Sequence, residues 1–246
     1  MIRPHDAQAI PIRGDLAAAQ ARAWARIARP GARWDGAQRI AIAAETRNAA
    51  LCRLCRARKE ALAPSAVAGT HDSLGALPEP VVEIVHRVAT DPGRLSERWY
   101  RGIIAGGLGE ERYVETISIV AHTVAIDTMA RGLGRDPQPL PAPQPGAPSG
   151  YRPRGAKPGP AWVPWVEPGD ATDGELVHYP SDRPAANIMK ALSLVPEEAE
   201  GFFDLVTRQY LPGAAMRDFT REYRAISHAQ IELLAARVSA LNQCLY

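Results

Sequence analysis

Two cysteines in the first quarter of the chain are the residues best suited to chemistry, because a thiolate is a strong nucleophile. Cys52 and Cys55 form a Cys-x-x-Cys pair, a spacing that brings two sulfurs close together on one face of a helix. A thiolate that attacks a peroxide becomes a sulfenic acid, which the neighbouring thiol resolves to a disulfide. The alternative is that both cysteines are small core residues on an alanine-rich helix. Five nearby cations would tend to lower the pKa of such thiols: Arg47, Arg53, Arg56, Arg58 and Lys59.

A carboxylate on the same expected helix, Glu45, is the first candidate proton carrier. If one helix runs unbroken over residues 36–63, Cys52 lies about 20° and Cys55 about 80° around its axis from Glu45. All three side chains would then share one side of the helix. Two turns separate Glu45 from Cys52, so a water or a substrate group would have to bridge them. The alternative is an ion pair between Glu45 and an arginine of its own helix or a contact with a neighbouring helix.

Three histidines are candidates to join the dithiol. His71 follows the expected helix in a loop and could fold back toward the sulfurs. His86 and His122 lie on apolar faces of expected helices, where a hydrogen-bonded core histidine is the common alternative. Glu115 and His122 are seven residues apart and share one helix face, so both could point into the pocket of the thiols. Packing and helix capping explain that pair almost as well.

The last stretch of the chain repeats part of this pattern. Residues 227–246 have apolar positions at helical spacing, with Ser227 as the expected N-cap of an amphipathic helix. Glu232 stands twelve residues before Cys244 in this stretch. Sliding the chain by 192 residues aligns Cys52 with Cys244, together with matching alanine and glutamine positions. This alignment indicates an internal repeat.

These motifs resemble the alkylhydroperoxidase D and carboxymuconolactone decarboxylase superfamily. Its peroxidase-related members carry a glutamate, eleven residues, and then Cys-x-x-Cys-x-x-x-His. Glu232 and Cys244 match that spacing as a partial motif, and the sequence ends before the second cysteine and the histidine. The first copy has the complete cysteine pair, but Ile40 stands at the glutamate position and Lys59 at the histidine position.

The resemblance implies an all-α fold of helical bundles that assembles into a homo-oligomer. It also implies a thiol-dependent, peroxidase-related antioxidant oxidoreductase that reduces hydroperoxides at Cys52 and Cys55. Glu45, Glu115 and His122 are then the candidate proton carriers, an external thiol is the reductant, and no bound cofactor is implied. Two alternatives stay open. One is a catalytically inactive structural protein derived from the family, and the other is a carboxymuconolactone decarboxylase-like enzyme, a branch that does not rely on a Cys-x-x-Cys pair.

Composition narrows the partners and the compartment. The 246-residue chain carries 29 basic and 27 acidic residues, a net charge of +2, which gives no reason to expect a nucleic acid or a membrane surface as partner. We see neither a secretion leader nor a run that could span a bilayer, and three cysteines favour a reducing cytoplasm. We expect no zinc site, because Cys52, Cys55 and one histidine lack a fourth ligand.

The order of elements predicts two helical units. Five expected helices form a first unit at 1–135: residues 15–29, 36–63, 78–89, 95–105 and 110–133. A partial second unit at 171–246 contains three expected helices: residues 185–193, 197–209 and 219–246.

A Pro-rich linker is expected between these units, over residues 136–170. Eleven of the 22 prolines lie between Pro137 and Pro168, which excludes helix and favours an extended chain. Trp162 and Trp165 indicate that the far end of the linker packs on a surface.

Overall fold

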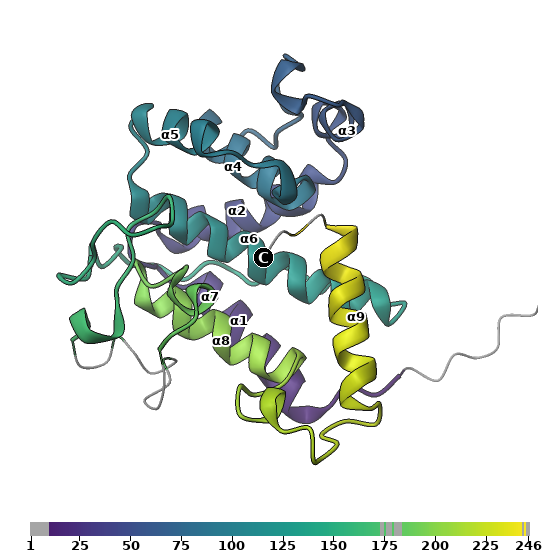
Figure 1. The fold of residues 1–246 in the computed structure, drawn as a ribbon. Coiled ribbons are helices and arrows are strands. Elements are labelled where there is room, and N and C mark those ends of the chain that lie inside the picture. Colours follow the sequence, from purple (N-terminus) through teal and green to yellow (C-terminus); the bar gives the residue numbers. More distant parts are fainter. Residues whose placement is uncertain (1–9, 173–174, 176–178, 180–183, 243, 245–246) are drawn as a thin grey trace, which may run out of the picture.

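The computed structural model describes residues 10–172, 175, 179, 184–242 and 244, and these residues are all-helical apart from connecting segments (Figure 1). Their only β pairing is an isolated antiparallel bridge between Lys157 and Trp165. The expectation of an all-α fold is confirmed. The described helices are α1 Gly14–Ala28, α2 Gly36–Ala49, α3 Arg53–Glu60, α4 Glu79–Thr90, α5 Glu97–Ala105, α6 Glu110–Gly132, α7 Asn187–Lys190, α8 Pro196–Gln209 and α9 His228–Leu241. Short 3-10 turns lie at Pro64–Ala66, Pro92–Arg94, Pro168–Asp170 and Ala215–Arg217.

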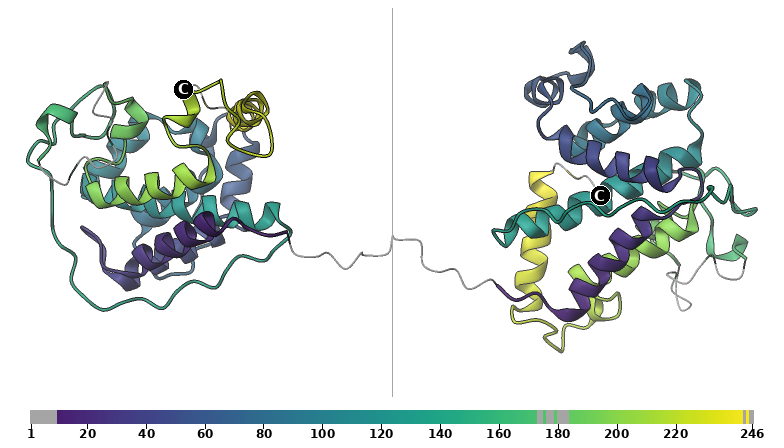
Figure 2. Two further views of the ribbon diagram at one scale, coloured as in Figure 1. Left: turned by 90° about the horizontal axis from the view of Figure 1, so that it is seen from below. Right: turned by 180° about the vertical axis from the view of Figure 1, so that it is seen from behind.

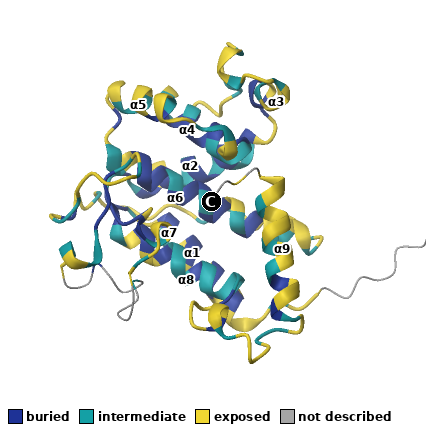
Figure 3. Ribbon diagram, viewed as in Figure 1, coloured by how far each residue is buried: buried dark blue, intermediate teal, exposed yellow. Residues whose placement is uncertain are grey.

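Three helices form the centre of the fold. α2, α4 and α6 pack against one another, and α1 lies against both α2 and α8. Their apolar side chains meet in one core, where Ile42, Ile84 and Ile119 have no exposed surface. Figure 3 shows the buried residues gathered along the helices in the middle of the molecule, whereas α9 is mostly exposed.

The parts of the chain expected as two units share this core. Leu194, Ala199 and Leu205, from the later part of the chain, belong to the same apolar cluster as residues of α1 and α6. The Pro-rich segment between them is extended and follows the outside of the helices (Figure 2). Its backbone is held to the end of α1, because the Gln144 N–H donates to the Ala28 carbonyl at 2.7 Å. Trp165 is buried, as its sequence context indicates.

The long helix expected over 36–63 is two helices. α2 ends at Ala49 and α3 begins at Arg53, and between them Cys52 has an extended backbone with φ −67° and ψ 125°. Hydrogen bonds to the loop before α4 stabilise this corner between α2 and α3. Asn48 Nδ2 donates to the Asp72 carbonyl at 2.6 Å, and the Asp72 N–H donates to Cys52 Sγ at 3.4 Å. The break therefore places Cys52 at the N-cap of α3.

The closing helix also differs from its expectation. Ser227 caps it as predicted, since its side chain accepts the Gln230 N–H, but residues 219–226 are not helical. Of its apolar positions Ile231 is buried, whereas Leu234 and Val238 are 58% and 57% exposed. The predicted helix also includes residues 243, 245 and 246, which lie outside the described part of the chain. None of the described helices combines the length and the apolar character that crossing a bilayer requires.

Candidate functional site

The two paired cysteines lie at the start of α3. Cys52 is the N-cap residue and Cys55 stands in the first turn, and both side chains are buried, with 1% and 3% of their surface exposed. Their sulfurs lie within 4.8 Å of each other. The spacing that follows from the sequence is therefore realised at a helix N-terminus, which favours a thiolate.

Two histidines face these sulfurs, and they come from different elements. His71 lies in the loop between α3 and α4, and its Nδ1 is 3.5 Å from the sulfur of Cys52 and 3.5 Å from that of Cys55. His86 lies on α4, and its Nδ1 is 3.2 Å from the Cys55 sulfur. The two sulfurs and the two Nδ1-bearing rings form one group, which we call the thiol–histidine cluster (Cys52, Cys55, His71 and His86).

A carboxylate orients each histidine from its far side. His86 Nε2 is 2.8 Å from Glu45 Oε1, and His71 Nε2 is 2.7 Å from Glu83 Oε2. A carboxylate accepts a hydrogen bond, so each imidazole carries a proton on Nε2. In the neutral imidazole Nδ1 then presents its lone pair to the sulfurs. Glu45 thus reaches Cys55 through His86, whereas the sequence predicted a water or a substrate group between Glu45 and Cys52.

Both carboxylates are themselves held in place. Glu45 has no exposed surface and accepts hydrogen bonds from Asn48 Nδ2 at 2.9 Å, from Ser73 Oγ at 3.1 Å and from the Leu74 N–H at 3.0 Å. Glu83 accepts from Arg58 Nη1 at 2.9 Å. It also accepts from Trp99 Nε1, at 3.0 Å. These contacts fix the carboxylates, and through them the histidine rings.

The surroundings shift the pKa values of the cluster toward charge separation between sulfur and imidazole. Burial, the largest influence, raises the pKa of Cys55, but hydrogen bonds from His71 and His86 outweigh it and bring the pKa to about 6. Burial lowers the pKa of His71, whereas its hydrogen bonds with Cys55 and Glu83 raise it to about 10. Burial raises the pKa of Glu83, and hydrogen bonds from His71 and Arg58 lower it to about 2.

The other predicted proton carriers, Glu115 and His122, belong to a separate group. Arg39 forms ion pairs with both Glu115 and Glu198, the latter at 2.7 Å. Ser118 Oγ donates to Glu198 at 2.6 Å, and His122 Nδ1 lies 2.8 Å from the Ser118 carbonyl oxygen. All five residues are buried. We call this group the buried charge cluster (Arg39, Glu115, Ser118, His122 and Glu198), and the structure does not bring its Glu115 or His122 to the dithiol.

The partial motif near the end of the chain also has different contacts from those of the first copy. Glu232 accepts a hydrogen bond from the Tyr210 hydroxyl at 2.6 Å and lies 3.4 Å from His228 Nε2. Cys244 is exposed and follows the end of α9.

The ligand count that argued against a metal site needs correction. His71 and His86 both face the two sulfurs, so four ligand atoms lie within 4.8 Å of one another, where the sequence count allowed only three. Sequence spacing does not show this, because His71 is in a loop and His86 is on another helix. Glu83 was missed as well. Its only signal is its position three residues before His86, on the same side of α4.

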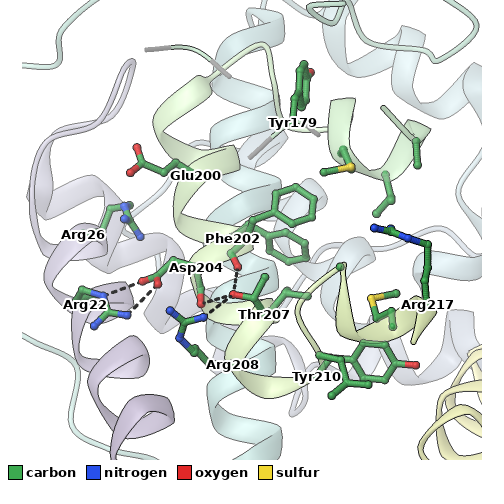
Figure 4. A pocket seen from close by; sticks show the side chains of 18 of the residues that line it. Arg22, Arg26, Tyr179, Glu200, Phe202, Asp204, Thr207, Arg208, Tyr210 and Arg217 are labelled. Carbon is green, nitrogen blue, oxygen red and sulfur yellow. Dashed lines mark hydrogen bonds and ion pairs between the residues drawn. The ribbon is translucent and has the colours of Figure 1, made fainter. Parts of the chain in front are cut away.

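A cavity of about 1100 Å³ lies in a different part of the molecule, beside α8 (Figure 4). Apolar side chains such as Phe202, Phe203 and Ile188 line it, and Arg22 and Asp204 form an ion pair at its edge. It shares no lining residue with the thiol–histidine cluster. This cavity is therefore distinct from the thiol–histidine cluster.

Comparisons with known proteins leave the family open. No family model, no curated protein and no solved structure matches the chain. Function must therefore be inferred from the chemistry of the site itself.

Proposed function

We propose that Cys52 and Cys55 form the redox centre of a thiol-dependent oxidoreductase that reduces hydroperoxides. The observation that carries this proposal is a chain of close contacts from the Cys55 sulfur to His86 and on to Glu45, with steps of 3.2 and 2.8 Å. A histidine oriented by a carboxylate can accept the proton of a thiol and return it to a leaving group. Cys52 has its sulfur within 4.8 Å of Cys55 and can act as the resolving thiol.

The reaction needs two steps at these sulfurs. In the first, the Cys55 thiolate attacks the terminal oxygen of the hydroperoxide, the O–O bond breaks, and the alkoxide leaves as an alcohol with a proton from His86. Cys55 is then a sulfenic acid. In the second, the Cys52 thiolate attacks the Cys55 sulfur, a disulfide forms, and hydroxide takes a proton and leaves as water. An external thiol returns the disulfide to two thiols, so the peroxide is reduced and the external thiol is oxidised.

Burial of the sulfurs limits the substrates. Cys52 and Cys55 are 1% and 3% exposed, and the loop over residues 61–78 contacts them through His71 and Val67. A small hydroperoxide therefore fits this proposal better than a bulky one, because a large substrate requires movement of the loop.

We also infer descent from the alkylhydroperoxidase D-like superfamily. The paired cysteines at a helix N-terminus, a histidine and a supporting glutamate support this inference. The departure is that Glu45 and His86 supply groups that the family motif would place at Ile40 and Lys59. A homo-oligomer and a reducing cytoplasm, which would supply the thiol reductant, belong to the same proposal.

A scaffold without activity is the second candidate, and the burial of both sulfurs favours it. Peroxide consumption by the full chain, with an external dithiol and with metal ions removed, separates the two. We expect turnover in the wild type, none above background in Cys55→Ser, and a Cys52–Cys55 disulfide by peptide mass spectrometry after peroxide treatment.

One variant and two controls test His86 as the proton carrier. His86→Ala should lower the rate constant by about 10²–10⁴-fold, as expected for loss of a general acid–base. His122→Gln changes a buried histidine of the other cluster, and Cys244→Ser removes the remaining thiol, so both should react as the wild type does. Equal peroxide consumption by Cys55→Ser and the wild type would reject the redox function.

A further inference from the structure

We infer that the reduced thiol–histidine cluster binds one zinc ion through four protein ligands: Cys52, Cys55, His71 and His86. This inference is independent of the redox function. Zinc binding needs two reduced thiols, but it does not need them to react with a peroxide. It also reverses the conclusion from the sequence, which counted too few ligands for a metal.

The distances within the cluster suit a tetrahedral ion. Zinc bonds of about 2.3 Å to sulfur and about 2.0–2.1 Å to nitrogen, at tetrahedral angles, place sulfur and nitrogen ligands roughly 3.5 Å apart. The contacts of His71 Nδ1 with the two sulfurs are both 3.5 Å, and that of His86 Nδ1 with Cys55 is 3.2 Å. All four ligand atoms lie within 4.8 Å of one another, so a single ion can contact all of them after small shifts.

The histidines have the orientation that a metal requires, and a bound ion would take the place of a proton on Nδ1. Each ring offers Nδ1 to the centre of the cluster and binds a carboxylate through Nε2, Glu45 for His86 and Glu83 for His71. This carboxylate–histidine–metal arrangement fixes the tautomer and the ring orientation, and it raises the basicity of the ligand. A further contact supports the sulfur of Cys52, which accepts the Asp72 N–H at 3.4 Å.

The chemistry of the ligands selects the ion. Two thiolates and two neutral imidazoles form an S₂N₂ set, which favours zinc or another thiophilic transition metal over Mg²⁺ and Ca²⁺. Two thiolates also neutralise a divalent cation, which matters because the cluster is buried. Four protein ligands leave no open position, so the ion is structural and not a site for substrate.

The region around the cluster explains what such an ion would do. Apart from the two cysteines, the local apolar cluster contains only buried Leu54 and partly buried Val67. Leu62 and Leu74, at the two ends of the intervening loop, are exposed. The ligands come from the start of α3, from this loop and from α4, so one ion would join three segments that share little apolar contact.

Zinc binding and the redox function use the same sulfurs in different states. A disulfide between Cys52 and Cys55 cannot supply two thiolates, so oxidation would release the ion. The two proposals therefore need separate readouts.

The test uses the full 246-residue chain, reduced, stripped of metal and kept without oxygen or peroxide. Titration with Co²⁺, a spectroscopic substitute for zinc, should saturate at one ion per chain with thiolate-to-cobalt charge-transfer absorption and the intense d–d bands of a four-coordinate ion. Zinc should then displace cobalt and abolish the bands. The disulfide form should show neither the charge-transfer absorption nor the intense d–d bands when cobalt is added. Reduced, folded wild type that gives no thiolate–cobalt bands, or only six-coordinate spectra, would overturn the inference.

Variants assign the four ligands. Replacing Cys52 or Cys55 by Ser, or His71 or His86 by Ala, should weaken zinc binding by more than the roughly 10–100-fold typical of losing a supporting carboxylate. His122→Gln and Cys244→Ser are the matched controls and should bind as the wild type does. Circular dichroism of each variant shows whether it folds, and unchanged affinity in folded His71→Ala and His86→Ala would exclude both histidines. Zinc binding without peroxide turnover would reject the redox function alone, and turnover without zinc binding would reject the metal site alone.

Discussion

The thiol–histidine cluster and the buried charge cluster contain similar groups, but the groups are matched differently. α2 connects the two clusters, because it supplies Arg39 to the charge cluster and Glu45, which contacts His86 of the thiol–histidine cluster. In the charge cluster one cation, Arg39, contacts both Glu115 and Glu198, so the charged groups pair directly with one another. In the thiol–histidine cluster four ligand atoms face one another across a small space, and carboxylates hold both histidines from behind. Buried polar residues alone thus do not identify a functional site, whereas four potential ligand atoms that converge on one point do.

The largest effect should come from removing the shared cation of the charge cluster. Arg39→Met leaves two buried carboxylates without their counter-ion, so we expect the free energy of unfolding to fall by about 3–5 kcal/mol. Urea denaturation measures it. Arg22→Met breaks the more exposed pair with Asp204 and should cost less than about 1 kcal/mol. Equal losses in the two variants would mean that the charge cluster is not a stabilising unit.

The same cluster should make stability depend on pH. Burial raises the pKa of Glu115 to about 7 against the opposing effect of Arg39, and Glu198 is the second carboxylate on that arginine. The native state then retains a proton that the unfolded chain releases above about pH 4.3, so the free energy of unfolding should fall as pH rises from there to about 7.

Comparison with Glu115→Gln isolates this effect, because glutamine does not titrate. From denaturation curves at several pH values, the wild type should lose up to about 3 kcal/mol relative to the variant across this window. Parallel stability profiles for the two proteins would contradict a raised pKa of Glu115.

A change at Glu45 tests whether the thiol–histidine cluster is pre-organised to bind a metal. Glu45→Gln places amide hydrogens among the donors Asn48, Ser73 and Leu74, so it should disturb the orientation of His86. We expect zinc affinity to fall by about 10–100-fold, measured by competition with a chromophoric chelator. Glu232→Gln changes the glutamate of the partial motif and should leave the affinity unchanged. If the two variants bind equally, Glu45 does not position a ligand.

The smallest effect should come from Asn48, which supports Glu45 from the edge of the cluster. Asn48→Ala removes hydrogen bonds of 2.9 Å to Glu45 and 2.6 Å to the Asp72 carbonyl. Since Asn48 is partly exposed and water can replace it, we expect a loss of about 1 kcal/mol in unfolding free energy and little change in zinc affinity. A loss as large as that of Arg39→Met would show that the α2–α3 corner depends on this residue.

Local features of the sequence predicted most helices. Helical periodicity located α1, α4, α5 and α6 to within about two residues, the usual uncertainty of helix ends. The N-cap Ser227 was predicted from a short-range hydrogen bond that depends only on its own neighbours. The sequence predicts one helix over residues 36–63, because no proline or glycine marks the break before Cys52. That break depends on contacts with residues 71 and 72, which periodicity does not detect.

By itself, the sequence determined an all-α protein with a Cys-x-x-Cys pair, because helical periodicity and the spacing of two thiols are local properties. Only the tertiary structure decided which groups meet that pair. It brought His71 from a loop and His86 from another helix to the sulfurs, and it placed Glu115 and His122 in a different cluster. The physical reason is that a metal or redox site depends on distances of a few ångströms between residues far apart in the chain, and packing of α2, α3 and α4 sets those distances.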